Sequence, residues 1–526
     1  MGMVNAVLRV DHRLYGQRDL KGSETNRRNE MTTKRTSTRW WLTAGVLGAF
    51  LTGSVMTATT ALADEGMAFP HYPSYITAKD GRSVAPGDWM DPAVCAGCHP
   101  RQAAGWRTSM HANSFRDIVF QAEWALGVTA TDGAVKNLCG GCHTPVGVLT
   151  GTVEFDPEMG KHGGFTTMGV ANNGVFCDVC HTVSGSSWRY TATGEPGNSS
   201  LILDPGNVKR ATLGDSKSPF HETVYSDLHA NASFCANCHN IFHPEHGFPI
   251  EYTYDEWKTS PYAHRGIQCQ DCHMVPVATA MRVADEMKRP HDLENHGLEG
   301  FAGMGGPMRD LVHDHGFVGG NSVIAEAMGV PGADAVRAEA IKRLQNAADL
   351  EFELYPGKQG ANLLKVKVTN TRAGHQLPTS LTFIRQVWLE VEVVDDQGRL
   401  MLSSGKLDEG NNIPGEAVKF INTSVDSEGR PTVDPWEVAG FSHMNTIPPK
   451  GHRYGAYAFV IPDGSETFTI TARLNYQSYT QELTDYLMGE GVLTVPTIMM
   501  EELVQTFDAN TMQRVDVEQD TRVVQR

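Results

Sequence analysis

Residues 95–99 of this chain read Cys95-Ala-Gly-Cys98-His99, and the same Cys-x-x-Cys-His pattern occurs four more times. The five copies use all ten cysteines of the 526-residue chain; they are Cys95–His99, Cys139–His143, Cys177–His181, Cys235–His239 and Cys269–His273. This spacing is the attachment signature of c-type haem, in which two thiols bond to the porphyrin and the next residue supplies an imidazole to the iron. We therefore expect five covalently attached haem c groups.

The pattern assigns a role to each residue type. The cysteines expected to hold haem are Cys95, Cys98, Cys139, Cys142, Cys177, Cys180, Cys235, Cys238, Cys269 and Cys272. The histidines expected as first axial ligands are His99, His143, His181, His239 and His273. A zinc site needs no histidine directly after the cysteine pair, and a disulfide framework would not repeat one local pattern five times.

The N-terminal segment is typical of an exported protein. Lys34, Arg35 and Arg39 precede a largely apolar run, residues 40–56, and residues 61–63 form a small-residue cleavage site. We expect a Sec-type signal peptide over residues 31–63, preceded by an upstream extension, and a periplasmic, extracellular or cell-surface location. Because the apolar run is short for a membrane span, an uncleaved anchor is the alternative interpretation.

The charge of the chain limits its partners. The formal net charge is -17, and residues 1–63 carry nine basic and four acidic side chains, so the exported chain has a net charge of -22. Such an acidic protein is not expected to bind nucleic acid or anionic lipid. We expect redox partner proteins with basic patches, while acidity that only keeps the protein soluble is the alternative. A membrane-associated electron donor or acceptor and an oligomeric state stay open.

The motifs are only 34 to 58 residues apart, so each haem has little protein around it. We expect a loop and short-helix domain with closely packed haems over residues 64–330. Val336, Ile341 and Leu344 lie at helical spacing and predict a linking helix over residues 331–358. After it the pattern alternates with a period of two, as in residues 364–369 and 387–393, which predicts an antiparallel, immunoglobulin-like β-sandwich over residues 359–526. The predicted fold class is therefore mixed.

Each iron has a second axial position, and its occupant separates a carrier from an enzyme. Fifteen histidines of the exported chain remain after the five motif histidines are assigned. Five of them stand out because they lie beside a motif with a nearby serine and aromatic residue, before a glycine pair, or in a loop after a predicted strand; they are His111, His229, His264, His315 and His375. A histidine bonded to a propionate or left in solvent is the alternative for each, and the other histidines rank lower.

Three further segments carry a family resemblance. Residues 234–239, 253–262 and 269–274 resemble multihaem c-type cytochromes of the cytochrome c-552/c-554 type, a group similar to the haem core of hydroxylamine oxidoreductase. The elements His-x-Phe-x-Gly-Gly at 315–320 and Gly-His-Gln-Leu-Pro-Thr at 374–379 resemble members with a C-terminal β-domain. The resemblance implies stacked, mostly bis-histidine haems that pass electrons in series. No Cys-x-x-Cys-Lys occurs, so the lysine-ligated haem of pentahaem nitrite reductases has no counterpart.

Three functions are compatible with these observations. The favoured one is an exported pentahaem cytochrome that relays electrons. The second is an oxidoreductase that acts on a small nitrogen or sulfur compound at one open haem. The third is a subunit of an extracellular cytochrome filament. The sequence identifies no catalytic residue, so enzyme activity stays undecided at this stage.

Overall fold

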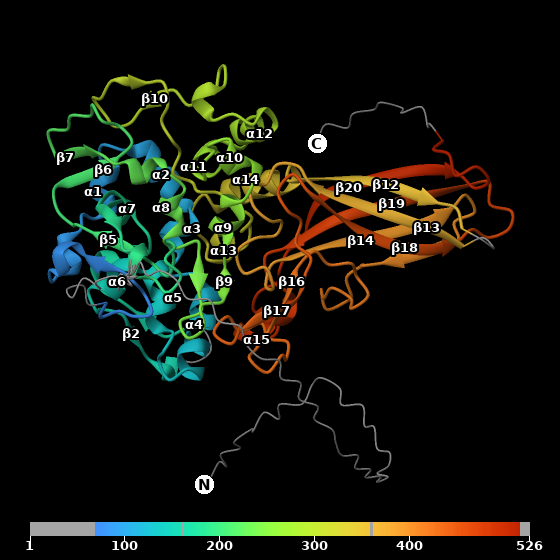
Figure 1. Cartoon of the computed structure of the whole chain (residues 1–526), viewed down its shortest axis with the longest axis horizontal. Helices are drawn as coiled ribbons and strands as arrows, with labels where there is room; N and C mark the ends of the chain where they lie inside the picture. Colours follow the sequence, from blue (N-terminus) through green and yellow to red (C-terminus); the bar gives the residue numbers. More distant parts are fainter. Residues whose placement is uncertain (1–68, 160–162, 358–360, 516–526) are drawn as a thin grey trace, which may run out of the picture. The chain divides into compact units, whose positions relative to one another are not determined.

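A region of short helices is followed by a region of long strands (Figure 1). The computed structural model describes residues 69–159, 163–357 and 361–515, so the predicted signal peptide lies outside the described residues. Within these ranges, none of the helices combines the length and the apolar character that a membrane span requires.

The first region consists of short elements. Its helices are α1 (Pro92–Ala96), α2 (Pro100–Thr108), α3 (Met110–Asn113), α4 (Ile118–Ala130), α5 (Lys136–His143), α6 (Pro145–Leu149), α7 (Cys177–His181), α8 (Ser233–Ala236), α9 (Thr253–Lys258), α10 (Pro261–His264), α11 (Gln270–His273), α12 (Val277–Glu286) and α13 (Ile324–Ala327). Its strands are β1 (Thr77–Ala78), β2 (Glu154–Phe155), β3 (Phe165–Thr166), β4 (Val183–Ser186), β5 (Leu201–Leu203), β6 (Val208–Ala211), β7 (Glu222–Tyr225), β8 (Ile241–Phe242), β9 (Pro249–Glu251), β10 (Gly300–Phe301) and β11 (Met308–Arg309).

Local sequence explains where these helices begin. The carboxylate of Asp117 accepts hydrogen bonds from the backbone N–H groups of Val119 and Phe120, at 2.9 and 3.1 Å, and so caps α4. Ser109 caps α3 in the same way. Such caps satisfy N–H groups that have no partner inside the helix, and each stabilises it by about 1 kcal/mol.

The connection between the two regions differs from the predicted helix. Helix α14 (Ala333–Gln345) ends at Gln345, and strand β12 (Ala348–Tyr355) begins three residues later. Leu350, Phe352 and Leu354 recur with a period of two in this segment, which suits a strand rather than a helix. The helical part of residues 331–358 is therefore shorter than predicted.

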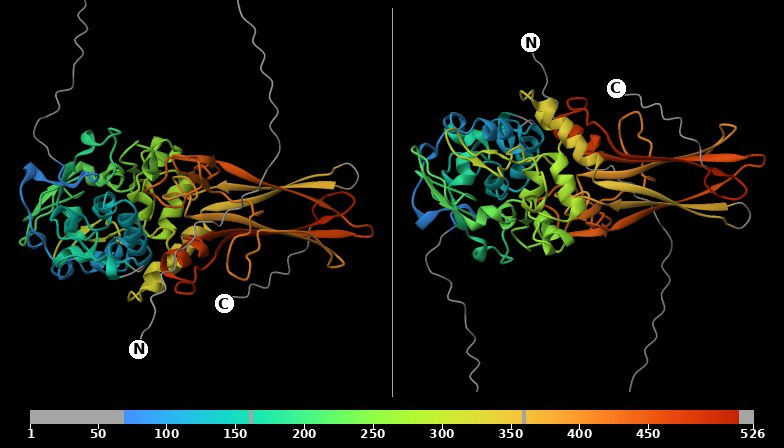
Figure 2. Two further views of the ribbon diagram at one scale, coloured as in Figure 1. Left: turned by 90° about the horizontal axis from the view of Figure 1, so that it is seen from below. Right: turned by 90° about the horizontal axis from the view of Figure 1, so that it is seen from above.

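Two antiparallel sheets form the second region and lie as two layers in Figure 2. One has the order β12, β13 (Ala361–Asn370), β18 (His452–Val460), and the other has the order β15 (Leu400–Ser404), β14 (Gln386–Asp395), β19 (Thr467–Gln477), β20 (Ile498–Asp508). A pair of short strands, β16 (Asn422–Val425) and β17 (Gly440–Met444), and helix α15 (Gln481–Met488) complete it.

The two sheets share one hydrophobic core. Val366 of one sheet and Val391 and Ile470 of the other are fully buried in it. Burial of each such side chain contributes roughly 1.5–3 kcal/mol. The strands before and after Pro462-Asp463-Gly464 lie in opposite sheets, because β18 pairs with β13 while β19 pairs with β14 and β20. The predicted antiparallel β-region is observed, and its immunoglobulin-like character stays a prediction.

The helical region and the β-region belong to one compact unit, residues 66–526. Lys450 of the β-region donates hydrogen bonds to the carbonyl oxygens of Ala284 and Thr371, at 2.9 and 2.6 Å. Thr379 donates to the carboxylate of Glu256 on α9 at 2.5 Å. These contacts hold the loop after β13, which carries His375, against the helical region.

Candidate haem-binding site

A cavity of about 1750 Å³ lies in the unit formed by residues 66–526, and every cysteine of the five motifs lines it. The five motif histidines line it as well. Protein interiors are close-packed, with few voids larger than a water molecule, so a cavity of this size marks the place of a large ligand. The sulfur atoms of each motif are three residues apart, which brings both to one side of a helical turn. The residues therefore fit covalently bound haem.

The motif histidines are oriented by hydrogen bonds at Nδ1. These join Nδ1 to the backbone carbonyl oxygens of Ala302 for His99 (2.6 Å), Ser114 for His143 (3.0 Å), Arg210 for His181 (2.7 Å) and Val318 for His273 (3.0 Å), and to a carboxylate oxygen of Glu251 for His239 (3.4 Å). An imidazole that donates from Nδ1 keeps the lone pair of Nε2 for a metal. All five are thus prepared to bind iron through Nε2.

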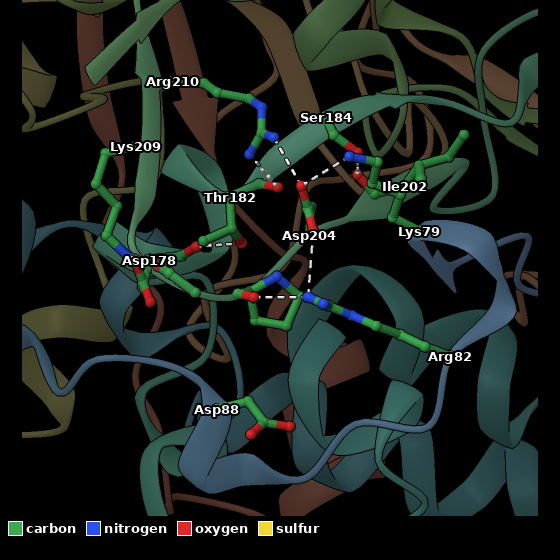
Figure 3. Close-up of polar contacts among 12 residues, drawn as sticks. Lys79, Arg82, Asp88, Asp178, Thr182, Ser184, Ile202, Asp204, Lys209 and Arg210 are labelled. Atoms are coloured by element: carbon green, nitrogen blue, oxygen red, sulfur yellow. Dashed lines mark hydrogen bonds and ion pairs between the residues drawn. The ribbon is translucent and has the colours of Figure 1, made fainter. Parts of the chain in front are cut away.

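Asp204 lies at the centre of an ion-pair cluster (Figure 3). Asp204 pairs with Arg210 at 2.7 Å, with Arg82 at 3.1 Å and with Lys79 at 3.2 Å. Although burial opposes it, Arg210 and Lys79 lower the pKa of Asp204, so the carboxylate stays ionised. The cluster fixes β6, and the carbonyl oxygen of Arg210 then receives Nδ1–H of His181. A hydrogen bond at Nδ1 sets the orientation of an imidazole that binds a metal through Nε2.

Other imidazoles face four of the motif histidines at one characteristic spacing. The ring centroids are 6.3 Å apart for His99 and His221, 6.3 Å for His239 and His111, and 6.2 Å for His273 and His375; for His181 they are 6.2 Å from His229 and 6.3 Å from His315. Imidazole nitrogen binds a first-row metal ion at roughly 2.0–2.1 Å and lies about 1.1 Å from its ring centroid, so two imidazoles on one ion have centroids about 6.2–6.4 Å apart. The observed spacing leaves room for one iron between each pair.

The predicted second ligands divide into three groups. His111 and His375 each face one motif histidine. His229 and His315 both face His181. Nε2 of His229 lies 2.9 Å from the carbonyl oxygen of Cys180, whereas His315 forms its hydrogen bond through Nδ1, so Nε2 of His315 is the more available of the two for a metal. His264 is exposed at the end of α10 and is not among the residues that line the cavity.

His221 has a position that the sequence analysis did not favour. It faces His99, and the run Ser218-Pro-Phe220-His221 has the serine, aromatic and histidine order that drew attention to His264. Its loop reaches the first motif because β7, directly after His221, pairs in parallel with β6. The local pattern could therefore have marked His221 as a candidate, but it does not show which motif the residue approaches.

His143 is different from the other motif histidines. Within residues 69–159, 163–357 and 361–515, no imidazole ring faces it at the spacing found for the other four. Its ring instead stacks on Phe120 of α4, with centroids 3.5 Å apart and planes inclined by 3°. The described part of the chain therefore offers one imidazole, that of His143, next to the second motif.

The electrostatic surroundings favour neutral imidazoles. Burial lowers the pKa of His111 and His273 to about 3 and that of His143 to about 4. These rings keep a free lone pair at neutral pH. His239 is an exception: burial acts to lower its pKa, but the Glu251 carboxylate raises it to about 9. A carboxylate partner makes an imidazole a more basic ligand.

The motifs also contact one another. The thiol of Cys95 lies beside that of Cys177, and the thiol of Cys235 lies beside that of Cys269. Cys142 lies 4.0 Å from the carbonyl oxygen of Cys238. The fourth motif therefore touches the second and the fifth, and the first touches the third.

Comparison with known proteins agrees with this site. Residues 94–182, which span the first three motifs, match the family described as cytochrome c554 and c-prime. The solved structure of a penta-heme cytochrome c552 from Thermochromatium tepidum is similar over 80% of this chain and 100% of that chain, with a TM-score of 0.52 and 16% identity. At this identity the likeness concerns the fold alone.

Two further comparisons found no useful similarity. A structural genomics target covers 30% of this chain and 82% of its own chain at 9% identity and a TM-score of 0.14. No curated protein matches the sequence.

The family match, the fold and the donor set of the cavity agree on one cofactor class. Thiols in Cys-x-x-Cys-His spacing bind haem c covalently, and paired imidazoles bind its iron. We conclude that the chain is a multihaem c-type cytochrome with a β-rich C-terminal region, in which residues 94–182 match the cytochrome c554 and c-prime family.

Proposed function

We propose that this protein relays electrons through five covalently bound haem c groups, four of them closed by two histidines. The observation that carries this proposal is the repeated spacing of 6.2–6.3 Å between imidazole centroids at four motifs. An iron with two imidazole ligands has no site for a substrate, so its chemistry is one-electron transfer.

Contacts between motifs support a continuous path. The first motif touches the third through Cys95 and Cys177, and the fourth touches the fifth through Cys235 and Cys269. Cys180 of the third motif acts electrostatically with Cys235 and Cys238 of the fourth. The proposed electron-transfer path therefore connects the first motif with the third, the third with the fourth and the fourth with the fifth. The second motif joins this path at the fourth.

The location and the partners follow from chemistry. Multihaem c-type cytochromes are typically exported, and the sequence of residues 31–63 has the features of a signal peptide. We propose a periplasmic or cell-surface protein. With a net charge of -22 after signal removal, the exported chain suits redox partners that present basic patches.

One observation favours a second function. His143 has Phe120, and no imidazole of the described residues, beside it, so an iron bound there keeps an open sixth position. An open haem iron binds small molecules, and the four closed haems would supply or remove electrons. The second candidate function is therefore oxidation or reduction of a small nitrogen or sulfur compound at the second motif.

Electron paramagnetic resonance of the oxidised protein tests both functions. Mass spectrometry first establishes that five haems are bound. We expect high-spin ferric iron for one haem in five and low-spin ferric iron for four, after spins are counted against total iron. Low-spin iron alone would contradict the open site, and high-spin iron at two or more haems would contradict the pairing of the imidazoles.

A further inference from the structure

The wall of the cavity beside the second motif combines residues of both regions. Asp117, the N-cap residue of α4, and Phe120 and Glu123 within the helix follow one another at intervals of three residues, and all three line the cavity. Phe120 stacks on His143, and Glu123 acts electrostatically on Cys139 of the same motif. The β-region adds Arg385, directly before β14, and Tyr479, two residues before α15.

Arg385 is held in place but has no counter-ion. One of its N–H groups donates to the carbonyl oxygen of Ser478 at 2.5 Å, and its guanidinium carbon lies 4.8 Å from the ring centroid of Tyr479. No carboxylate of the described residues lies within ion-pair distance of the guanidinium. A guanidinium has five N–H donors, and an unpaired charge inside a protein is costly.

The two nearby carboxyl groups do not form an ion pair with Arg385. Burial raises the pKa of Asp117 to about 6 and that of Glu123 to about 7, even though Arg385 acts to lower both. Asp117 already accepts two backbone hydrogen bonds, and Glu123 has no hydrogen-bond partner among the described residues. At neutral pH Asp117 is therefore mostly ionised and Glu123 about half ionised, but neither carboxylate forms an ion pair with Arg385, whose remaining N–H donors face the cavity without a bound carboxylate.

We propose that Arg385, held by Ser478 and Tyr479, binds an anionic oxygen group in the cavity beside His143. Guanidinium groups bind carboxylates and small oxyanions through paired N–H donors. Two sources offer this chemistry: a small oxyanion that reaches the open iron, or a propionate of the haem itself. The inference rests on the open iron proposed above, and the β-region then contributes to the site as well as packing against it.

The variant Arg385→Met tests the proposal, with nitrite and sulfite as anionic probes and imidazole as a neutral probe. Affinities are measured from the Soret shift of the oxidised protein, and the midpoint potential from a redox titration of the high-spin signal. If a small oxyanion is the partner, nitrite and sulfite bind roughly 10- to 100-fold more weakly, while imidazole affinity is unchanged. If a propionate is the partner, anion affinity is unchanged and the midpoint potential falls, because a cation that stabilised the reduced haem is lost.

Matched variants separate this role from a structural one. Arg385→Lys keeps the charge and should retain most of the anion affinity and of the midpoint potential. This variant preserves the test if Arg385→Met does not fold. Arg473→Met removes an arginine of β19 that pairs with Glu390 and Glu502. It should change neither the anion affinity nor the midpoint potential.

The outcomes are distinct. Unchanged anion affinity together with an unchanged potential in Arg385→Met would overturn the proposal. Absence of high-spin iron in the unmodified protein would contradict the proposed open site. In that case the potentials of the low-spin haems still decide whether Arg385 pairs with a propionate.

Discussion

Replacement of His375 by alanine should open the iron that His273 binds. The two rings lie 6.2 Å apart, so alanine removes the second imidazole from this position. Four of the five motif histidines face another imidazole, which predicts high-spin iron at one haem in five for the unmodified protein. The variant should have high-spin iron at two haems in five.

The loop around His375 should survive the substitution. Its backbone is anchored by Asn370, which donates to the carbonyl oxygen of His375 at 2.9 Å, and by Glu256, which accepts from the N–H of Gln376 at 3.1 Å. Neither contact uses the imidazole. Added imidazole should therefore enter the space left by the side chain and return the high-spin fraction to one in five.

The assay is quantitative electron paramagnetic resonance on protein with five haems confirmed by mass. His264→Ala is the matched control, because His264 is exposed and does not line the cavity, and it should leave the fraction at one in five. A fraction that stays at one in five in His375→Ala would refute the argument from imidazole spacing. A rise that imidazole does not reverse would indicate loss of structure instead.

Three further predictions concern neighbouring residues. Glu251→Gln removes the carboxylate beside His239 and should raise the midpoint potential of the fourth haem, by on the order of 60 mV for each tenfold loss of ferric stabilisation, in a spectroelectrochemical titration. Burial raises the pKa of the Glu256 carboxyl group to about 8, so as the pH rises the unfolded chain loses this proton before the folded protein does. Between pH 4.5 and 8 the free energy of unfolding should therefore fall by up to about 1.4 kcal/mol per pH unit. Denaturant unfolding of Glu256→Gln should lack this loss. His315→Ala should produce more high-spin iron than His229→Ala, because Nε2 of His229 is engaged with Cys180; equal spectra would contradict that ranking.

Local chemistry made part of this protein predictable. The Cys-x-x-Cys-His motif carries its thiols and its imidazole within five residues, so its role does not depend on the rest of the chain. Strands β13 and β14 were predictable because alternation with a period of two reports burial of one face. The predicted helix after Pro331 is too long. Its last residues alternate with a period of two and form strand β12 instead.

The sequence by itself determined the cofactor class and the β-rich character of the C-terminal region, and it predicts five attachment points. Only the tertiary structure decided which imidazoles face each other, that His221 joins His99, and that His143 has Phe120 as its neighbour. It also decided that Arg385 reaches the helical region's cavity. The physical reason is distance along the chain: a second axial ligand or a counter-ion is brought close by the packing of elements that are far apart in sequence, and no spacing rule within one segment encodes that approach.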